Sequence, residues 1–201
     1  MIRFFYNLAP NPMKVALFLE EAGLPYEAVP VDTRKGEQHL PAYTAVNPNA
    51  KCPALVDGDT TIFDSNAIVL YLAEKTGRFL PAQTPAARGE MLSWLMFIAS
   101  GIGPYSGQSV HFRHFAPEPK AYALNRYDFE AWRHWRLIDE RLSTRRFMLA
   151  TTTRWWTSRC GVGRVWCHSC WAARTPGRSC QTLNGGWTKS TSGRQPNASR
   201  R

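Results

Sequence analysis

The order of strand-like and helix-like patterns in residues 1–77 restricts the fold more than any other feature of this sequence. Short apolar runs rich in β-forming residues predict strands, and apolar residues at helical spacing predict two helices that end at Gly23 and Gly77. The turn residues Gly58-Asp59 indicate a hairpin. The expected strands are residues 2–6, 26–31, 54–57 and 60–63, and the expected helices lie within residues 10–22 and 67–75.

These elements follow one another as strand, helix, strand and then strand, strand, helix, which is the order of a thioredoxin-like α/β domain. We assign this domain to residues 1–80. A proline-rich link over residues 79–88 comes next, after which strand signals vanish. Apolar residues at helical spacing over residues 91–98 and 122–142 predict that residues 87–150 form a helical domain.

Residues 151–201 differ in composition from the rest of the chain. All 15 acidic residues precede residue 151, whereas 9 of the 25 basic residues, five of the eight Trp and four of the five Cys follow residue 150. A basic, Trp-rich tail would suit nucleic acid, and Cys167 with Cys170 would suit zinc or redox chemistry. We expect neither, because an error of reading frame accounts for the same residues.

Several classes of protein are disfavoured by the remaining sequence. No apolar run approaches the roughly 20 residues of a membrane-spanning helix, and the first residues lack the pattern of a secretory signal. Before residue 151 the 16 basic and 15 acidic residues nearly balance. We therefore expect a cytoplasmic protein with neither a membrane nor a nucleic-acid partner.

Four motifs in residues 1–150 occur in the order found in one known family. They are Ala9-Pro10-Asn11-Pro12-Met13-Lys14, Asn47-Pro48-Asn49-Ala50-Lys51-Cys52-Pro53-Ala54-Leu55, Asp64-Ser65-Asn66-Ala67-Ile68 and Gly103-Pro104 through Gly107-Gln108. With these motifs the sequence resembles the cytosolic glutathione S-transferases, and among them the bacterial, nu-class-like branch of glutathione-dependent disulfide reductases. The resemblance implies a homodimer whose subunits combine a thioredoxin-like glutathione-binding domain with a helical domain, here disrupted after about residue 150.

Glutathione, the cosubstrate that the resemblance implies, is an acidic tripeptide whose thiol must ionise near neutral pH. A helix that begins at Asp64-Ser65 suits a carboxylate, because a helix start offers unpaired N–H groups and Ser65 adds a hydroxyl. Asp64 and Ser65 are therefore candidate glutathione ligands. Plain capping of the helix by these residues is the alternative.

Lys51, Cys52 and Pro53 resemble the family segment that ends in a cis-proline, where the main chain pairs with the backbone of the glutathione cysteine. The resemblance therefore implies that all three bind glutathione. Two interpretations of the Cys52 side chain stay open. It is either a small hydrophobic residue of the core, which we favour, or a thiol that forms a mixed disulfide with glutathione.

Asn11 is the candidate catalytic residue. The group that stabilises the thiolate belongs between the first strand and the first helix, where backbone N–H groups and a short polar side chain reach the sulfur. Helix capping is the alternative role of Asn11. Related reductases have a Thr two residues earlier, where this chain has Ala9, which lacks a hydroxyl.

Two further residues have roles implied by the resemblance. Gln38 is similar to a family residue that binds the glycine end of glutathione, and Lys51 could pair with the same carboxylate. Arg126 matches an arginine that reaches glutathione across the dimer interface of related reductases. A solvated surface position is the alternative for each of these residues.

A pocket for the second substrate could be lined near Tyr105 by aromatic and His side chains. The candidates are His111, Phe112, His114 and Phe115. The two His residues also raise the possibility of a metal ion, but no further ligand lies at suitable spacing, so we predict no metal site.

Trp has a single codon, so the nucleotide sequence at each Trp is known. This limits the residues that a reading frame shifted one nucleotide upstream can encode there. Through residues 154–157 the shifted frame permits Thr-Val-Val-Asp, a capping box like the one that opens the core helix of the family's second domain. Through residues 193–197 it permits the Arg-Pro-Ala ending common in the family. We therefore expect a single frameshift near residues 148–150, which makes residues 151–201 an aberrant basic tail.

The sequence thus predicts an enzyme that activates the glutathione thiol for transfer to a small electrophile or for reduction of a disulfide. The alternative is a catalytically inactive glutathione-binding remnant, which Ala9 and the disrupted second domain favour.

Overall fold

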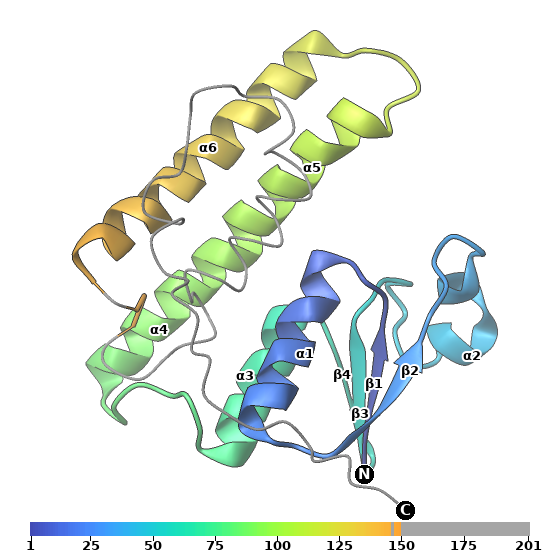
Figure 1. Cartoon of the computed structure of the whole chain (residues 1–201), viewed down its shortest axis with the longest axis vertical. Helices are drawn as coiled ribbons and strands as arrows, with labels where there is room; N and C mark the ends of the chain where they lie inside the picture. Colours follow the sequence, from blue (N-terminus) through green and yellow to red (C-terminus); the bar gives the residue numbers. More distant parts are fainter. Residues whose placement is uncertain (146, 150–201) are drawn as a thin grey trace, which may run out of the picture.

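A four-stranded mixed sheet forms the first part of the chain in the computed structural model, which describes residues 1–145 and 147–149 (Figure 1). The strand order is β2-β1-β3-β4, with β1 parallel to β2 and antiparallel to β3. The strands are β1 (Ile2–Tyr6), β2 (Tyr26–Pro30), β3 (Ala54–Asp57) and β4 (Thr60–Phe63). The expected thioredoxin-like sheet is confirmed.

Helices α1 (Pro10–Ala22) and α3 (Ser65–Thr76) pack on one face of the sheet, and the short α2 (Pro41–Thr44) lies on the other side (Figure 1). Successive residues of a strand point to opposite faces. Phe4 accordingly lies in the main apolar cluster together with residues of α1 and α3, whereas the next residue, Phe5, packs with Tyr43 of α2.

Glycine ends both long helices of this domain, as expected from the sequence. Gly23 and Gly77 have φ values of 63° and 64°, a left-handed conformation that a side chain disfavours. After α1 the chain closes the turn with two backbone hydrogen bonds, from the N–H of Gly23 to Glu20 and from the N–H of Leu24 to Leu19. The turn at Gly23 leads from α1 into β2, and the turn at Gly77 leads from α3 toward the helical part of the chain.

The helical part begins with α4 (Pro85–Phe97), which continues through a π-helical segment, η2 (Ile98–Ile102), into α5 (Gly103–His114). After a turn, α6 (Ala121–Thr144) runs back alongside α5 (Figure 1). The helical region expected after the sheet domain is confirmed. The domain boundaries assigned from the sequence stay predictions, with α3 ending at Thr76 and α4 beginning at Pro85.

One apolar cluster extends through both parts of the chain. Its buried members include Phe4, Val15, Phe18, Leu19, Leu55, Ile68, Leu72, Leu95, Ile98, Ile102, Ile138 and Leu142. Helix α1 thus contributes to a core that it shares with α4, η2 and α6. Among the described residues, none of the helices is long and apolar enough to cross a membrane. The expected basic tail and frameshifted segment, residues 151–201, lie outside the described residues.

Candidate functional site

Four chain segments meet at one edge of the sheet. Strand pairing places Phe5 opposite Ala54, and Ala54 opposite Phe63, so the end of β1, the start of β3 and the end of β4 lie together. Tyr6 pairs with Pro30, which brings the end of β2 to the same edge. The segments that flank these strand ends carry seven of the eight predicted site residues: Asn11, Gln38, Lys51, Cys52, Pro53, Asp64 and Ser65.

The start of α3 is capped by Asp64. Its Oδ1 accepts hydrogen bonds from the N–H groups of Asn66 (2.8 Å) and Ala67 (3.2 Å). The expectation of a helix start with unpaired N–H groups is therefore wrong for these two, because the carboxylate of the preceding residue reaches them first. Ser65, the first residue of the helix, is only 3% exposed. A carboxylate at this site would meet the N–H and hydroxyl of Ser65.

Asp64 adopts an uncommon backbone conformation, with a φ of 70° and a ψ of 125°. Such strain in a residue that is not glycine persists only where the surroundings enforce it, and it is enriched at ligand-binding sites. Both cap hydrogen bonds use Oδ1. The second carboxylate oxygen, Oδ2, could therefore accept a hydrogen bond from an amino group.

The start of α1 offers few hydrogen-bond donors. Pro10 and Pro12 have no N–H, and the N–H of Ala9 donates to the side chain of Asn7 (3.0 Å). Asn11 is therefore the one residue among the first three of the helix that has a backbone N–H. Its side chain is exposed, and no side chain caps this helix. Any thiolate bound here would depend on Asn11 for its donors.

The segment before Pro53 is held by contacts that the sequence did not reveal. The Cys52–Pro53 peptide bond is cis, as the resemblance implies. The carbonyl oxygen of Lys51 accepts hydrogen bonds from Tyr43 Oη (2.8 Å) and Asn47 Nδ2 (2.6 Å). Asn47 is 1% exposed, so its amide is committed to this contact. Side-chain bonds of this kind leave no periodic signal in a sequence.

The Cys52 side chain contacts the second apolar cluster of the sheet domain. This half-buried side chain packs against the cluster of Phe5, Val31, Tyr43, Ala54 and Val56. Burial raises the pKa of the Cys52 thiol, and the hydrogen bond from Tyr43 Oη (3.5 Å) opposes this effect in part. A protonated thiol is a poor nucleophile, so these surroundings favour the role of a core residue.

Gln38 lies in η1 (Glu37–His39), the turn that leads from β2 to α2. Its Oε1 is buried and has no hydrogen-bond partner among residues 1–145 and 147–149. A buried amide oxygen without a protein partner is free to accept a hydrogen bond from a ligand. Asn7 ties this loop to the start of α1 by donating from Nδ2 to Thr33 Oγ1 (3.1 Å). The Lys51 side chain is exposed.

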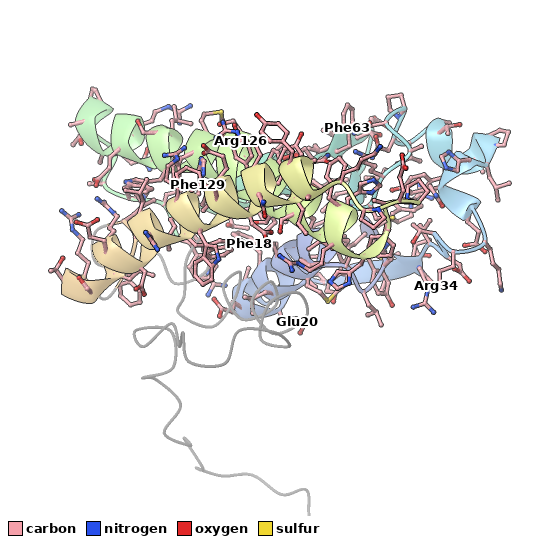
Figure 2. All side chains as sticks on the ribbon, turned by 90° about the horizontal axis from the view of Figure 1, so that it is seen from above. Phe18, Glu20, Arg34, Phe63, Arg126 and Phe129 are labelled. Atoms are coloured by element: carbon pink, nitrogen blue, oxygen red, sulfur yellow. The ribbon has the colours of Figure 1, made fainter. Side chains whose placement is uncertain are left out.

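Arg126 lies on α6, in the helical part of the chain. Its guanidinium forms an ion pair with Glu130 (2.7 Å), one turn later on the same helix. Figure 2 shows Arg126 and Phe63 toward the same long side of the molecule, and Glu20 toward the opposite side. Within a single chain Arg126 is therefore a surface residue with an intrahelical partner, and its role across an interface stays a prediction.

The proposed lining of the second-substrate pocket lies at the α5–α6 hairpin. Phe112 stacks on Tyr127 (ring centroids 5.3 Å apart), Tyr105 lies 6.4 Å from Tyr127, and His111 contacts Phe112 edge to face. Phe115 is 70% exposed. No three His, Cys, Asp or Glu residues gather for a metal ion in the part of the chain that the structure describes.

In the comparison with protein families, residues 2–74 match the family of the glutathione S-transferase N-terminal domain. Among curated relatives, the disulfide-bond oxidoreductase YfcG of Escherichia coli is 42% identical over 149 residues, which cover 71% of this chain and 69% of the relative. A glutathione S-transferase domain-containing protein of Dictyostelium discoideum is 38% identical over 150 residues, covering 70% of this chain and 58% of the relative.

Solved structures of glutathione transferases are also similar to this chain. A glutathione transferase family member of Pseudomonas fluorescens with two glutathione bound superposes with a TM-score of 0.74 at 36% identity, over 82% of this chain and 76% of that one. A glutathione transferase of Pseudomonas putida with one glutathione disulfide bound per subunit has a TM-score of 0.74 at 34% identity, over 82% and 75% of the two chains.

Proposed function

We propose, from the premise that this chain belongs to the glutathione S-transferase family, that it binds glutathione at the sheet edge and activates the glutathione thiol for attack on a disulfide or a small electrophile. The observation that carries the proposal is the convergence of four segments at that edge, set by the pairing of Phe5, Ala54 and Phe63. Each segment brings one type of group that an acidic, thiol-bearing tripeptide needs.

The proposed ligands divide by the part of glutathione that they meet. The N–H and hydroxyl of Ser65 would receive the γ-glutamyl carboxylate, and Asp64 Oδ2 would accept from the neighbouring amino group. The main chain of Cys52 would pair with the glutathione cysteine. Gln38 and Lys51 would meet the glycine carboxylate, and the buried, unpartnered Gln38 Oε1 supports a polar ligand there.

Activation of the thiol would fall to Asn11. A free thiol has a pKa of about 8.5, so it is mostly protonated at neutral pH. Hydrogen bonds from the Asn11 N–H and side chain would favour the thiolate, with help from the positive end of the α1 dipole. Because Pro10 and Pro12 contribute no donors, we expect weaker activation than a helix start with three N–H groups would give.

Disulfide reduction is the reaction that we favour. The thiolate of glutathione would attack one sulfur of a disulfide, form a mixed disulfide and release the other sulfur as a thiolate. A second glutathione would then displace the remaining thiol and leave as glutathione disulfide. Similarity to a disulfide-bond oxidoreductase and to a transferase with bound glutathione disulfide supports this choice. A thioether product would favour conjugation instead.

An inactive glutathione-binding remnant is the second candidate. Ala9 supplies no hydroxyl to the thiol, and two of the first three residues of α1 are prolines, so the stabilising groups at this position are few. The frameshift proposed for residues 151–201 would also remove part of the helical domain. Glutathione affinity without turnover would support this candidate.

A homodimer is the assembly that we propose, with Arg126 reaching the partner's glutathione. Exposed apolar side chains support an interface on the described surface: Phe63 is 42% exposed and Met96 is 54% exposed. Arg126 lies on the same side as Phe63 (Figure 2). Loss of the dimer in Phe63→Glu, measured by analytical ultracentrifugation, would support this arrangement, and a monomeric unaltered chain would contradict it.

The test of the proposed function is glutathione binding by calorimetry, followed by a disulfide-reduction assay. Both use this chain and a version with residues 151–201 restored to the other reading frame. Activity in both means that residues 1–150 suffice, and activity only in the restored chain means that this polypeptide is a damaged copy. Absence of binding in both would refute the glutathione site.

A further inference from the structure

Lys14 is a cation placed between the two helix starts of the proposed site. It follows Asn11 by one turn of α1, and residues three apart lie on the same side of a helix. Its Nζ donates a hydrogen bond of 3.1 Å to Asn66 Oδ1, in the first turn of α3. Asn66 directly follows Ser65. Lys14 therefore joins the segment that carries Asn11 to the segment that carries Ser65.

The surroundings of Lys14 are unfavourable for a charge. Burial lowers the pKa of Lys14 to about 8, and the negative charge of Asp64 opposes this effect only in part. Among the described residues, Asp64 is the charged group that acts on Lys14, and Asn66 is neutral. An ammonium group has three donors, and Asn66 accepts from one. A partly buried cation of this kind is stabilised when an anion binds beside it.

We infer that Lys14 is a positioning residue of the glutathione site, whose positive charge favours a ligand carboxylate at Ser65 and whose hydrogen bond to Asn66 holds the start of α3. The inference rests on the proposed function, since it assigns a role toward the same ligand. None of the four motifs pointed to this role, because the two partners are 52 residues apart in the sequence.

Protonation of Lys14 and binding of an anion beside it favour each other, and this sets the direction of the pH effect. An anion beside Lys14 raises the pKa of its ammonium group above the value of about 8 in the free protein. The complex then holds a proton that the free protein has lost, so affinity for the anion falls as the pH rises through about 8. Below that pH Lys14 is charged in both states and affinity does not change through this group.

The test measures binding of S-methylglutathione from about pH 6.5 to about pH 9.5, on either side of the Lys14 pKa. This ligand keeps both carboxylates and has no thiol to titrate. The proteins are the unaltered chain, Lys14→Arg, Lys14→Met and the control Lys120→Met, which removes an exposed lysine that pairs with Glu118. The amino group of the ligand titrates in the same way with all four proteins. A difference between the pH profiles of their affinities therefore reports on the substituted residue.

We expect the affinity of the unaltered chain to fall, relative to Lys14→Arg, by roughly tenfold across this range, which corresponds to about one pKa unit. Lys14→Arg stays charged and lacks this loss. Lys14→Met binds roughly tenfold more weakly at low pH and lacks the Lys14-dependent step, whereas Lys120→Met follows the unaltered chain. If Lys14→Met fails to fold, as judged by circular dichroism, the comparison with Lys14→Arg decides the matter.

A parallel pH profile in the unaltered chain and Lys14→Arg would overturn the role of Lys14 while leaving the glutathione site intact. Failure of the unaltered chain to bind either S-methylglutathione or glutathione at any pH would instead refute the proposed function, and this inference with it.

Discussion

Gly101 lies so close to His134 that a β-carbon at residue 101 would come within 2.4 Å of the imidazole ring. The ring has little freedom to move, because it stacks on Phe97 and also contacts the tilted ring of Tyr105, at centroid distances of 4.9 and 5.0 Å. Its Nδ1 also donates to the carbonyl oxygen of Glu130 (2.7 Å). The contact fixes how η2 and α6 approach each other.

Gly101→Ala should therefore destabilise the protein. The added methyl group forces either the ring or the π-helical segment to shift, and such overpacking costs about 1–3 kcal/mol of unfolding free energy. Urea unfolding measures the change. Gly107→Ala is the matched control, because a β-carbon there meets nothing within 4 Å and alanine favours a helix by up to about 1 kcal/mol. Equal stability of the two variants would contradict the packing argument.

Ser65→Ala should weaken glutathione binding without a comparable loss of stability. The buried hydroxyl is one of the two groups that we assign to the γ-glutamyl carboxylate, and loss of a hydrogen bond to a charged group costs about 1.5–3 kcal/mol, at least tenfold in affinity. Calorimetry measures the affinity. Ser93→Ala, which removes an exposed hydroxyl bound to the Gly89 carbonyl, is the control and should bind normally. Unchanged affinity in Ser65→Ala would exclude the assigned contact.

Asn11→Ala should raise the pKa of the bound glutathione thiol and slow disulfide reduction by about tenfold or more. The opposite change is available two residues earlier, where Ala9→Thr introduces the hydroxyl that this chain lacks. We expect Ala9→Thr to lower the thiol pKa and raise the rate. The ultraviolet absorbance of the thiolate, followed against pH, measures both variants. A thiol pKa that is the same in all three proteins would remove Asn11 from the activation step.

Cys52 should react slowly with alkylating agents at neutral pH. Burial raises the pKa of its thiol, so the thiolate fraction at neutral pH is smaller than that of an ordinary cysteine. Mass spectrometry of the peptide that contains Cys52 measures its labelling rate, and the labelling rate of free glutathione serves as the reference. Cys52→Val, which keeps a small apolar side chain against Phe5 and Tyr43, should retain glutathione binding and turnover. Loss of turnover in that variant would favour the mixed-disulfide interpretation.

Sequencing of the genomic DNA should reveal a gained or lost nucleotide near the codons for residues 148–150. Restoring the other frame should supply the capped core helix and raise stability, because neighbouring apolar side chains would then be covered. Thermal unfolding of the two chains measures the difference. DNA that encodes residues 151–201 as written, with no shift, would refute the frameshift.

The strands and long helices were predictable because each has a periodic signal. The observed β1 and the hairpin β3–β4 match the expected ranges, and α6 extends the expected range of residues 122–142 by one residue at its start and two at its end. The short helix α2 has only four residues and begins with Pro41, so residues 32–49 show turn chemistry without helical spacing. A helix of that length cannot be distinguished from a loop by pattern.

The site was predictable as a set of motifs but not as a set of contacts. Asp64 at a helix start is an N-cap by residue type, and its capture of the Asn66 and Ala67 N–H groups depends on a φ of 70° that no sequence pattern announces. The hydrogen bonds from Tyr43 and Asn47 to the Lys51 carbonyl oxygen connect α2 and the turn after it to the loop before β3. Contacts of this kind become visible only when the chain is folded.

The apolar cluster shared by the two parts of the chain has a consequence for how such a protein can change over generations. Phe18 and Leu19 of α1 belong to the same core as Leu95 of α4 and Ile98 of η2, and Asn11 also lies on α1. Because α1 packs in this shared core, a substitution of one of the core residues outside α1 can shift the helix and with it Asn11, the residue that we propose for thiolate stabilisation. If the proposed activity holds, selection on that activity and selection on core packing would therefore act on overlapping sets of residues.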